Sequence, residues 1–242
     1  AHGNYVGGIV GKLDTNSITN CSSSLNISLS VTDSSGSGEN GNTVTQSNTG
    51  GIVGGFENSS YASVSQCAYS GTITTSGTGA FINLGGIVGI AGTISNCTTS
   101  GAINMAGGRM ENVGGIAGRV YSSTTNCISN MSITLNSNAN KYGISNIQYV
   151  GGLVGNGVTI TNCTTNGTIT ASASNSFDSY YAQINYVGGL VGTAYTISSS
   201  SASGAINIKS GKSAQYVGGI AGYLRNLSLI HISEPTRLRC IS

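Results

Sequence analysis

The motif Tyr149-Val-Gly-Gly-Leu-Val-Gly155 is the strongest indication of the fold, because the chain repeats it along most of its 242 residues. A Gly-Gly pair, then Ile or Leu, then Val or Ala, then Gly occurs seven times. Self-similarity at intervals of roughly 30 to 40 residues is typical of solenoids, propellers and other repeat architectures. The first glycines of the seven pairs are Gly7, Gly50, Gly85, Gly114, Gly151, Gly188 and Gly218, and four copies carry Tyr-Val in front, at Tyr5, Tyr149, Tyr186 and Tyr216.

A second block of the Ile-Thr-Asn-Cys type follows the first six pairs. Its last position holds Cys21, Cys67, Cys97, Cys127, Cys163 and, in the sixth copy, Ser200. Six residues further on stands an isoleucine in every copy: Ile27, Ile73, Ile103, Ile133, Ile169 and Ile206.

Each repeat therefore contains three short β-type segments punctuated by glycine, which allows tight corners. We predict an all-β fold, a right-handed parallel β-solenoid (β-helix) of about six to seven turns, with one repeat of roughly 30–37 residues per turn. A propeller is the alternative, but its four-stranded blades usually need roughly 40–50 residues. The handedness rests on the general rule for parallel crossovers.

The composition supports an ordered chain and excludes several functions. Charged residues make up 7% and the formal net charge is +2, while hydrophobic residues still reach 38%. A nucleic-acid-binding protein needs clustered Lys and Arg, which are scattered here. No apolar stretch approaches the roughly 20 residues that span a bilayer. We expect no nucleic-acid partner and no membrane contact within this chain.

The last residues break the pattern. Leu227-Ser-Leu-Ile-His-Ile-Ser-Glu-Pro-Thr-Arg237 contains the only proline of the chain. Read back into codons, this stretch looks like a transposase-type sequencing adapter, and Leu238 to Ser242 fit an index followed by the next constant segment. We therefore expect residues 227–242 to be a translated adapter, which is excluded from fold reasoning, and 1–226 to be a solenoid fragment without caps at either end.

The repeat resembles the GLUG motif family, which is named for its Gly-Leu-Gly-type core. Gly151-Gly-Leu-Val-Gly155 and Gly188-Gly-Leu-Val-Gly192 fit best, and Gly114-Gly-Ile-Ala-Gly118 carries Ala where Val is usual. The resemblance covers about residues 5–226. It implies an extracellular repeat region of adhesin-like proteins or surface-protease precursors, and it carries over no catalytic residues.

Repeat length varies mainly between the isoleucine and the next Gly-Gly pair. Insertions at one position of each coil collect on one edge of a solenoid, which is often the binding face. Exposed aromatic rings there could stack on sugars, so the candidate ligand-contact residues are Tyr142, Phe177, Tyr180 and Tyr181. The alternative is that these rings only cover the flank of the solenoid.

The five repeated cysteines are expected to form a column in the core, since free Cys behaves as a small buried hydrophobe and Ser200 replaces it once. Disulfides and a metal site are alternatives. Parallel side chains in a ladder are poorly directed for a disulfide, and zinc sites usually need close Cys pairs.

We predict no enzymatic activity, no catalytic or metal-binding residues and no cofactor, because acidic residues are few and His2 is the only histidine outside the tail. The expected function is that of an extracellular or cell-surface stalk that contacts glycans or host and cell-surface proteins through its edge loops. One alternative is a targeting or substrate-binding annex of a larger secreted peptidase or polysaccharide-degrading enzyme. The other is ice binding, because Thr72-Ile-Thr74 and Thr168-Ile-Thr170 resemble threonine rows.

Overall fold

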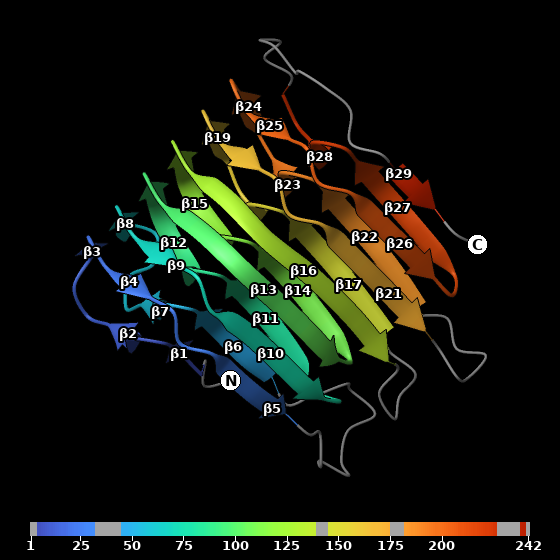
Figure 1. Ribbon diagram of the computed structural model, residues 1–242, viewed down its shortest axis with the longest axis horizontal. Coiled ribbons are helices and arrows are strands. Elements are labelled where there is room, and N and C mark those ends of the chain that lie inside the picture. The colour runs from blue at the N-terminus through green and yellow to red at the C-terminus, as the bar shows by residue number, and fades with distance from the viewer. Residues whose placement is uncertain (1–3, 32–44, 139–144, 175–181, 227–237, 241–242) are drawn as a thin grey trace.

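The computed structural model describes residues 4–31, 45–138, 145–174, 182–226 and 238–240. Its elements are all strands, arranged as a parallel solenoid in which each coil contributes to three sheets (Figure 1). The predicted all-β parallel solenoid is thereby confirmed, while its right-handedness stays a prediction. Among the described residues there is no helix with the length and apolar character that a bilayer crossing demands.

Sheet A contains the strand that enters each Gly-Gly pair. Its parallel strands, in spatial order, are β1 (Val6–Gly7), β6 (Thr45–Gly50), β11 (Ala80–Gly85), β14 (Arg109–Gly114), β17 (Ser145–Gly151), β22 (Ala182–Gly188) and β27 (Ser213–Gly218). The first glycines of all seven repeats pair with one another, Gly7 with Gly50 and so on to Gly218. The seven repeats seen in the sequence are thus seven coils in one register, numbered here from the N-terminus.

Sheet B contains the strands that leave the Gly-Gly pair. They are β2 (Val10–Leu13), β7 (Val53–Phe56), β12 (Val88–Ser95), β15 (Ala117–Thr125), β18 (Val154–Asn156), β23 (Val191–Ala194) and β28 (Ala221–Leu224), with β3 (Ser17–Thr19), β8 (Ser63–Ser65), β19 (Thr159–Thr161) and β24 (Thr196–Ser198) continuing the same sheet.

Sheet C follows the cysteine position. Its strands are β5 (Ile27–Val31), β10 (Thr72–Gly77), β13 (Thr98–Gly107), β16 (Ile128–Asn138), β21 (Ile169–Ser174), β26 (Ile206–Ser210) and β29 (Leu238–Cys240), with the short β4 (Ser22–Ser23), β9 (Ala68–Tyr69), β20 (Thr164–Thr165) and β25 (Ser201–Ala202) beside them. Strand β29 pairs with β26 although it lies in the expected adapter segment. Backbone pairing does not test the origin of that segment, which stays a prediction.

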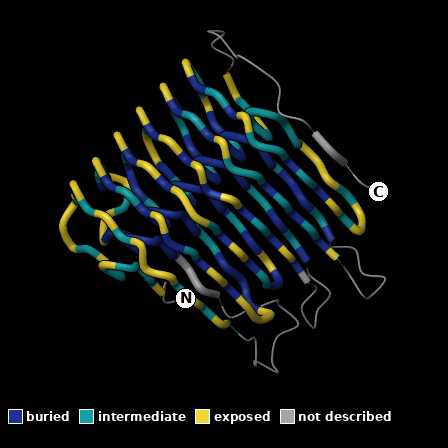
Figure 2. Tube along the Cα trace, viewed as in Figure 1, coloured by how far each residue is buried: buried dark blue, intermediate teal, exposed yellow. Residues whose placement is uncertain are grey.

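The core consists of columns of equivalent residues from successive coils. The repeated isoleucine forms one unbroken column, because Ile27, Ile73, Ile103, Ile133, Ile169 and Ile206 are register partners. From coil 2 onward these side chains are at most 1% exposed. Figure 2 shows the same buried stretches returning coil after coil, whereas the first and last coils are partly exposed because, among the described residues, each has a neighbouring coil on one side only.

The glycine pairs are required by close packing rather than by an unusual backbone angle. A Cβ atom on Gly151 would lie 2.1 Å from the carbonyl oxygen of Val154, and one on Gly152 would lie 2.2 Å from the carbonyl oxygen of Gly189 in the next coil. Positive φ angles fall instead almost entirely on Asn, Tyr, Gln and Ser residues, with Gly77 and Gly101 as the glycines that adopt them in the described chain.

Candidate functional site

One column of side chains changes its chemistry partway along the solenoid. It is formed by the residue two positions before each first glycine, which the pairing register of sheet A skips without shifting, and we call it the bulge column. From coil 2 to coil 7 every member has a φ between 54° and 58°: Asn48, Asn83, Asn112, Tyr149, Tyr186 and Tyr216. Tyr5 holds this position in coil 1, and from coil 2 onward three asparagines are followed by three tyrosines.

The asparagine part of the column is a hydrogen-bonded ladder. The side-chain amide of Asn83 donates to Oδ1 of Asn48 at 2.9 Å, and the amide of Asn112 donates to Oδ1 of Asn83 at the same distance. The ladder ends at Asn112, which is 3% exposed and whose Oδ1 is buried without a hydrogen-bond partner. Tyr149 occupies the next position and presents a ring where another amide would donate.

The tyrosine part of the column is a stack of rings. The ring centroids of Tyr149 and Tyr186 are 4.9 Å apart, and those of Tyr186 and Tyr216 are 4.8 Å apart with planes only 1° from parallel. Tyr223 of strand β28 stands nearly perpendicular to Tyr186 and Tyr216, at 6.2 and 6.1 Å. Burial, followed by the neighbouring Tyr186, raises the pKa of Tyr149, so its phenol stays protonated at neutral pH.

This left-handed backbone suits asparagine better than tyrosine. An L-residue in the left-handed region is strained by about 1–2 kcal/mol, and Asn relieves part of this because its short polar side chain bonds locally. Each stacked aromatic pair returns about 0.5–1.5 kcal/mol. Three strained tyrosines joined by two stacks therefore gain little stability from their position, and strain of this kind tends to gather at ligand sites.

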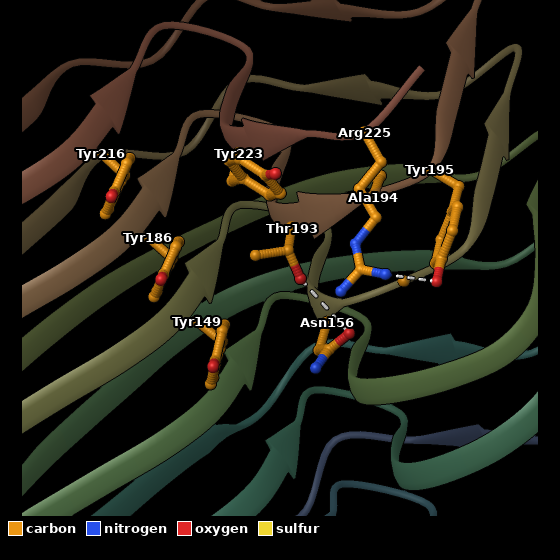
Figure 3. Close-up of a pocket in the computed structure, with 10 residues that line it drawn as sticks. Tyr149, Asn156, Tyr186, Thr193, Ala194, Tyr195, Tyr216, Tyr223 and Arg225 are labelled. Carbon is orange, nitrogen blue, oxygen red and sulfur yellow. Dashed lines mark hydrogen bonds between the residues drawn. The ribbon is translucent and has the colours of Figure 1, made fainter.

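A groove of about 370 Å³ opens beside the tyrosine stack. Figure 3 shows the stacked rings on one side, Tyr195 and Arg225 on the other, and Asn156 and Thr193 between them. Asn156, Thr193 and Tyr223 are register partners in sheet B, so they supply one side chain per coil. Thr193 donates from Oγ1 to Oδ1 of Asn156 at 3.3 Å.

Arg225 is the charged residue that lines this groove. Its guanidinium lies 4.7 Å from the ring centroid of Tyr195 and donates to the Tyr195 hydroxyl. Within the described part of the chain, Arg225 forms no ion pair with a carboxylate, since the two ion pairs there join Lys12 to Glu57 and Arg109 to Glu111.

A second hollow of about 370 Å³ lies on sheet C and is lined mainly by hydroxyl groups: Ser22, Ser23, Ser24, Ala68, Tyr69, Ser70, Thr98, Thr99, Ser100 and Asn130. The outward row beside it is chemically mixed, because Thr74 pairs with Asn104 and Asn104 pairs with Thr134. Burial raises the pKa of Tyr69 to about 12, and its hydroxyl donates to the carbonyl oxygen of Leu25 at 2.8 Å.

The five repeated cysteines are free thiols at one position of successive coils: Cys21, Cys67, Cys97, Cys127 and Cys163. The last four are at most 1% exposed. Thiols of Cys67, Cys97, Cys127 and Cys163 donate to the carbonyl two residues earlier, and Ser200 does the same through its hydroxyl. Hydrogen bonding to neighbouring thiols, together with burial, raises the pKa of Cys67 and of Cys127. No group of three metal-ligating side chains occurs within the described ranges.

The predicted contact residues Tyr142, Phe177, Tyr180 and Tyr181 all lie outside the described residues. In the sequence, Tyr149, Tyr186 and Tyr216 stand out only as a prefix of the repeat, with no function assigned to them. Nothing in the sequence pattern singles out Tyr195, Tyr223 or Arg225. The replacement of Asn by Tyr at one repeat position is the signal in the sequence that could have identified this groove.

Comparison with known proteins agrees with this architecture. Residues 2–28 match the family model described as the GLUG motif. No curated protein and no solved structure gives a significant match. GLUG motifs are found in extracellular repeat-containing proteins, which supports a general surface or secreted role. The match lies in coil 1, and six more copies of the same Gly-Gly element are stacked on it in register, which supports the resemblance of this repeat to the GLUG motif.

Proposed function

We propose that this chain is the extracellular repeat region of a surface or secreted protein, in which the solenoid acts as a stalk and its groove contacts a glycan or a protein on another surface. One observation carries the proposal. The uniform stack of seven coils places the exposed tyrosine groove on its outer surface. A stack of this kind can lengthen by adding coils without changing the coils already present.

We also propose that the chain has no enzymatic activity. Hydrolysis of sugars or peptides by acid–base chemistry needs a pair of carboxylates or a base beside a nucleophile. Of the described carboxylates, Glu57 and Glu111 each pair with a cation on the surface. The groove itself is lined by five phenols, one amide, one aliphatic hydroxyl and one guanidinium, which suit binding.

Adhesion of coated beads tests this function. Beads carrying the purified protein are passed over cultured epithelial cells, and beads carrying the same protein after irreversible unfolding serve as the control. We expect the folded protein to retain beads under flow and the unfolded protein not to. Equal retention of the two kinds of beads, or none by either, contradicts the adhesive role.

A further inference from the structure

We propose that the tyrosine groove binds an acidic oligosaccharide that runs along the solenoid axis, with a sugar carboxylate held by Arg225 and sugar hydroxyls held by Asn156, Thr193 and the phenols of the bulge column. This inference rests on the proposed function and narrows its contact to one class of ligand.

The lining of the groove matches the hydroxyl rim of a sugar. Eight of its ten residues carry a polar side-chain group, and five of those eight are tyrosines. The column tyrosines cover one another's faces by stacking, so they offer a sugar their phenol hydroxyls, and a pyranose ring carries a rim of hydroxyls that need donors and acceptors. The volume of about 370 Å³ falls within the range of small-ligand sites.

The spacing between successive coils of the solenoid suits an extended chain of sugars. Successive rings of the bulge column are 4.9 and 4.8 Å apart, close to the length of one sugar unit in an extended chain. Asn156, Thr193 and Tyr223 repeat at the same spacing on the neighbouring column because they are register partners. An oligosaccharide parallel to the axis would therefore meet one tyrosine and one sheet B side chain per unit.

The charge of the groove selects an acidic sugar. The stacking of Arg225 on Tyr195 and its single hydrogen bond to that hydroxyl leave other guanidinium N–H groups for a ligand. Arg119, the register partner of Asn156 in the preceding coil, lies outside the lining of the groove, with its guanidinium 4.9 Å from the ring centroid of Tyr121. Guanidinium groups bind carboxylates through two parallel hydrogen bonds, which neutral sugars cannot accept in the same way.

A sugar also fits this surface better than a protein segment does. The groove offers few aliphatic side chains, whereas protein interfaces usually bury a hydrophobic centre. A protein partner is therefore the competing outcome of the test below.

Calorimetric titration with matched ligands tests the inference. The probes are tetragalacturonic acid and a hyaluronan octasaccharide, each compared with its carboxyl-reduced, neutral form. We expect at least one acidic probe to bind about tenfold more tightly than its neutral form. Replacing Arg225 by Gln should remove this preference while leaving residual binding of both forms. Failure of both acidic probes to bind, or equal affinity for the acidic and neutral forms, overturns the inference.

A triple variant separates the tyrosine stack from the fold. Tyr149→Asn, Tyr186→Asn and Tyr216→Asn together install the residue that coils 2 to 4 already use at this position. We expect the β-sheet circular dichroism to be kept and the affinity for the acidic probe to fall at least about tenfold. Tyr61→Ala is the matched control, because Tyr61 is 77% exposed and lies outside the groove. Equal binding by the triple variant and the control contradicts the role of the stack.

The two proposals fail in different ways. Beads that adhere to cells while no acidic probe binds would leave the adhesive function intact and point to a protein partner. Probe binding in solution without adhesion of beads would support the sugar site and contradict the adhesive role.

Discussion

Coils 2 to 4 and coils 5 to 7 share one backbone but use the bulge column in opposite ways. In the first region Asn48, Asn83 and Asn112 join neighbouring coils by amide hydrogen bonds and are largely buried. In the second region tyrosines occupy the equivalent position with the same positive φ, stack on one another and border an open groove. The asparagines stabilise the stack internally, whereas the tyrosines present an outer surface.

The difference shows that a repeat position can be released from a stabilising role without changing the fold. The register of sheet A continues without a shift from β14 to β17, where the residue type changes. The junction leaves a defect, the unpartnered Oδ1 of Asn112. A buried acceptor without a hydrogen bond costs about 1–3 kcal/mol, so the change to tyrosine carries a local penalty.

Breaking the asparagine ladder at its centre should have the largest effect. Asn83→Val removes a donor and an acceptor, leaves the amides of Asn48 and Asn112 without partners, and places a β-branched residue at a positive φ. We expect a loss of about 4 kcal/mol in the free energy of unfolding, measured with denaturant. Asn83→Gly, which tolerates the backbone angle, should lose clearly less. Equal losses in the two variants would show that the backbone strain is unimportant.

Alkaline pH should weaken the asparagine region through Tyr69. The folded pKa of about 12 exceeds the unfolded value of about 10, so its contribution is complete below about pH 10 and is lost as the pH rises towards about 12. The two-unit difference corresponds to at most about 3 kcal/mol. Comparing wild type with Tyr69→Phe from about pH 8 to about pH 12 isolates this effect, since the variant should lose less stability. Parallel curves would exclude Tyr69 as the cause.

Replacing tyrosine by asparagine should raise the free energy of unfolding at Tyr149 and lower it at Tyr186. Tyr149→Asn relieves backbone strain and offers an amide to Oδ1 of Asn112, so we expect a gain of about 1 kcal/mol despite one lost stack. Tyr186→Asn loses two stacks and meets no amide, so we expect a loss of about 1 kcal/mol. Thermal unfolding of both variants tests this, and changes of the same sign would contradict the account of the junction.

The smallest effect is expected in the cysteine column, which runs through both regions. Cys163→Ser should cost at most about 1 kcal/mol, because the hydroxyl of Ser200 already makes the equivalent bond to the carbonyl two residues earlier. Thiol titration should show Cys67, Cys97, Cys127 and Cys163 unreactive when folded and reactive after denaturation, since these residues are at most 1% exposed to the reagent. Rapid reaction of these four thiols in the folded protein would contradict this.

The columns could be predicted from the sequence because the same blocks recur in the same order although repeat length varies. The isoleucine follows the cysteine position by six residues in all six copies, and stacking places such residues side by side. The groove could not be predicted in this way. The lining residues of the groove come from three successive coils, so they lie together only because of how sheet A and sheet B fold against each other. They are Tyr149 and Asn156 from one coil, Tyr186, Thr193 and Tyr195 from the next, and Tyr223 and Arg225 from the last.

The positive φ of the bulge column could not be predicted from the sequence either. Tyrosine rarely adopts a positive φ, and nothing in Tyr149-Val-Gly-Gly marks the tyrosine rather than a glycine as the strained residue. A glycine usually indicates an unusual backbone angle, whereas Gly152 is needed because the next coil leaves no room for a Cβ atom.

The order of residues in the bulge column also bears on how the chain finds its register during folding. Coils that resemble one another this closely could pair one repeat out of step, and misassembly of this kind is characteristic of repeat proteins. A slipped pairing that set Asn83 or Asn112 against a tyrosine would leave further amides without partners. Keeping three asparagines together and three tyrosines together therefore gives the nascent chain an internal marker, by which correctly matched neighbours are more stable than mismatched ones.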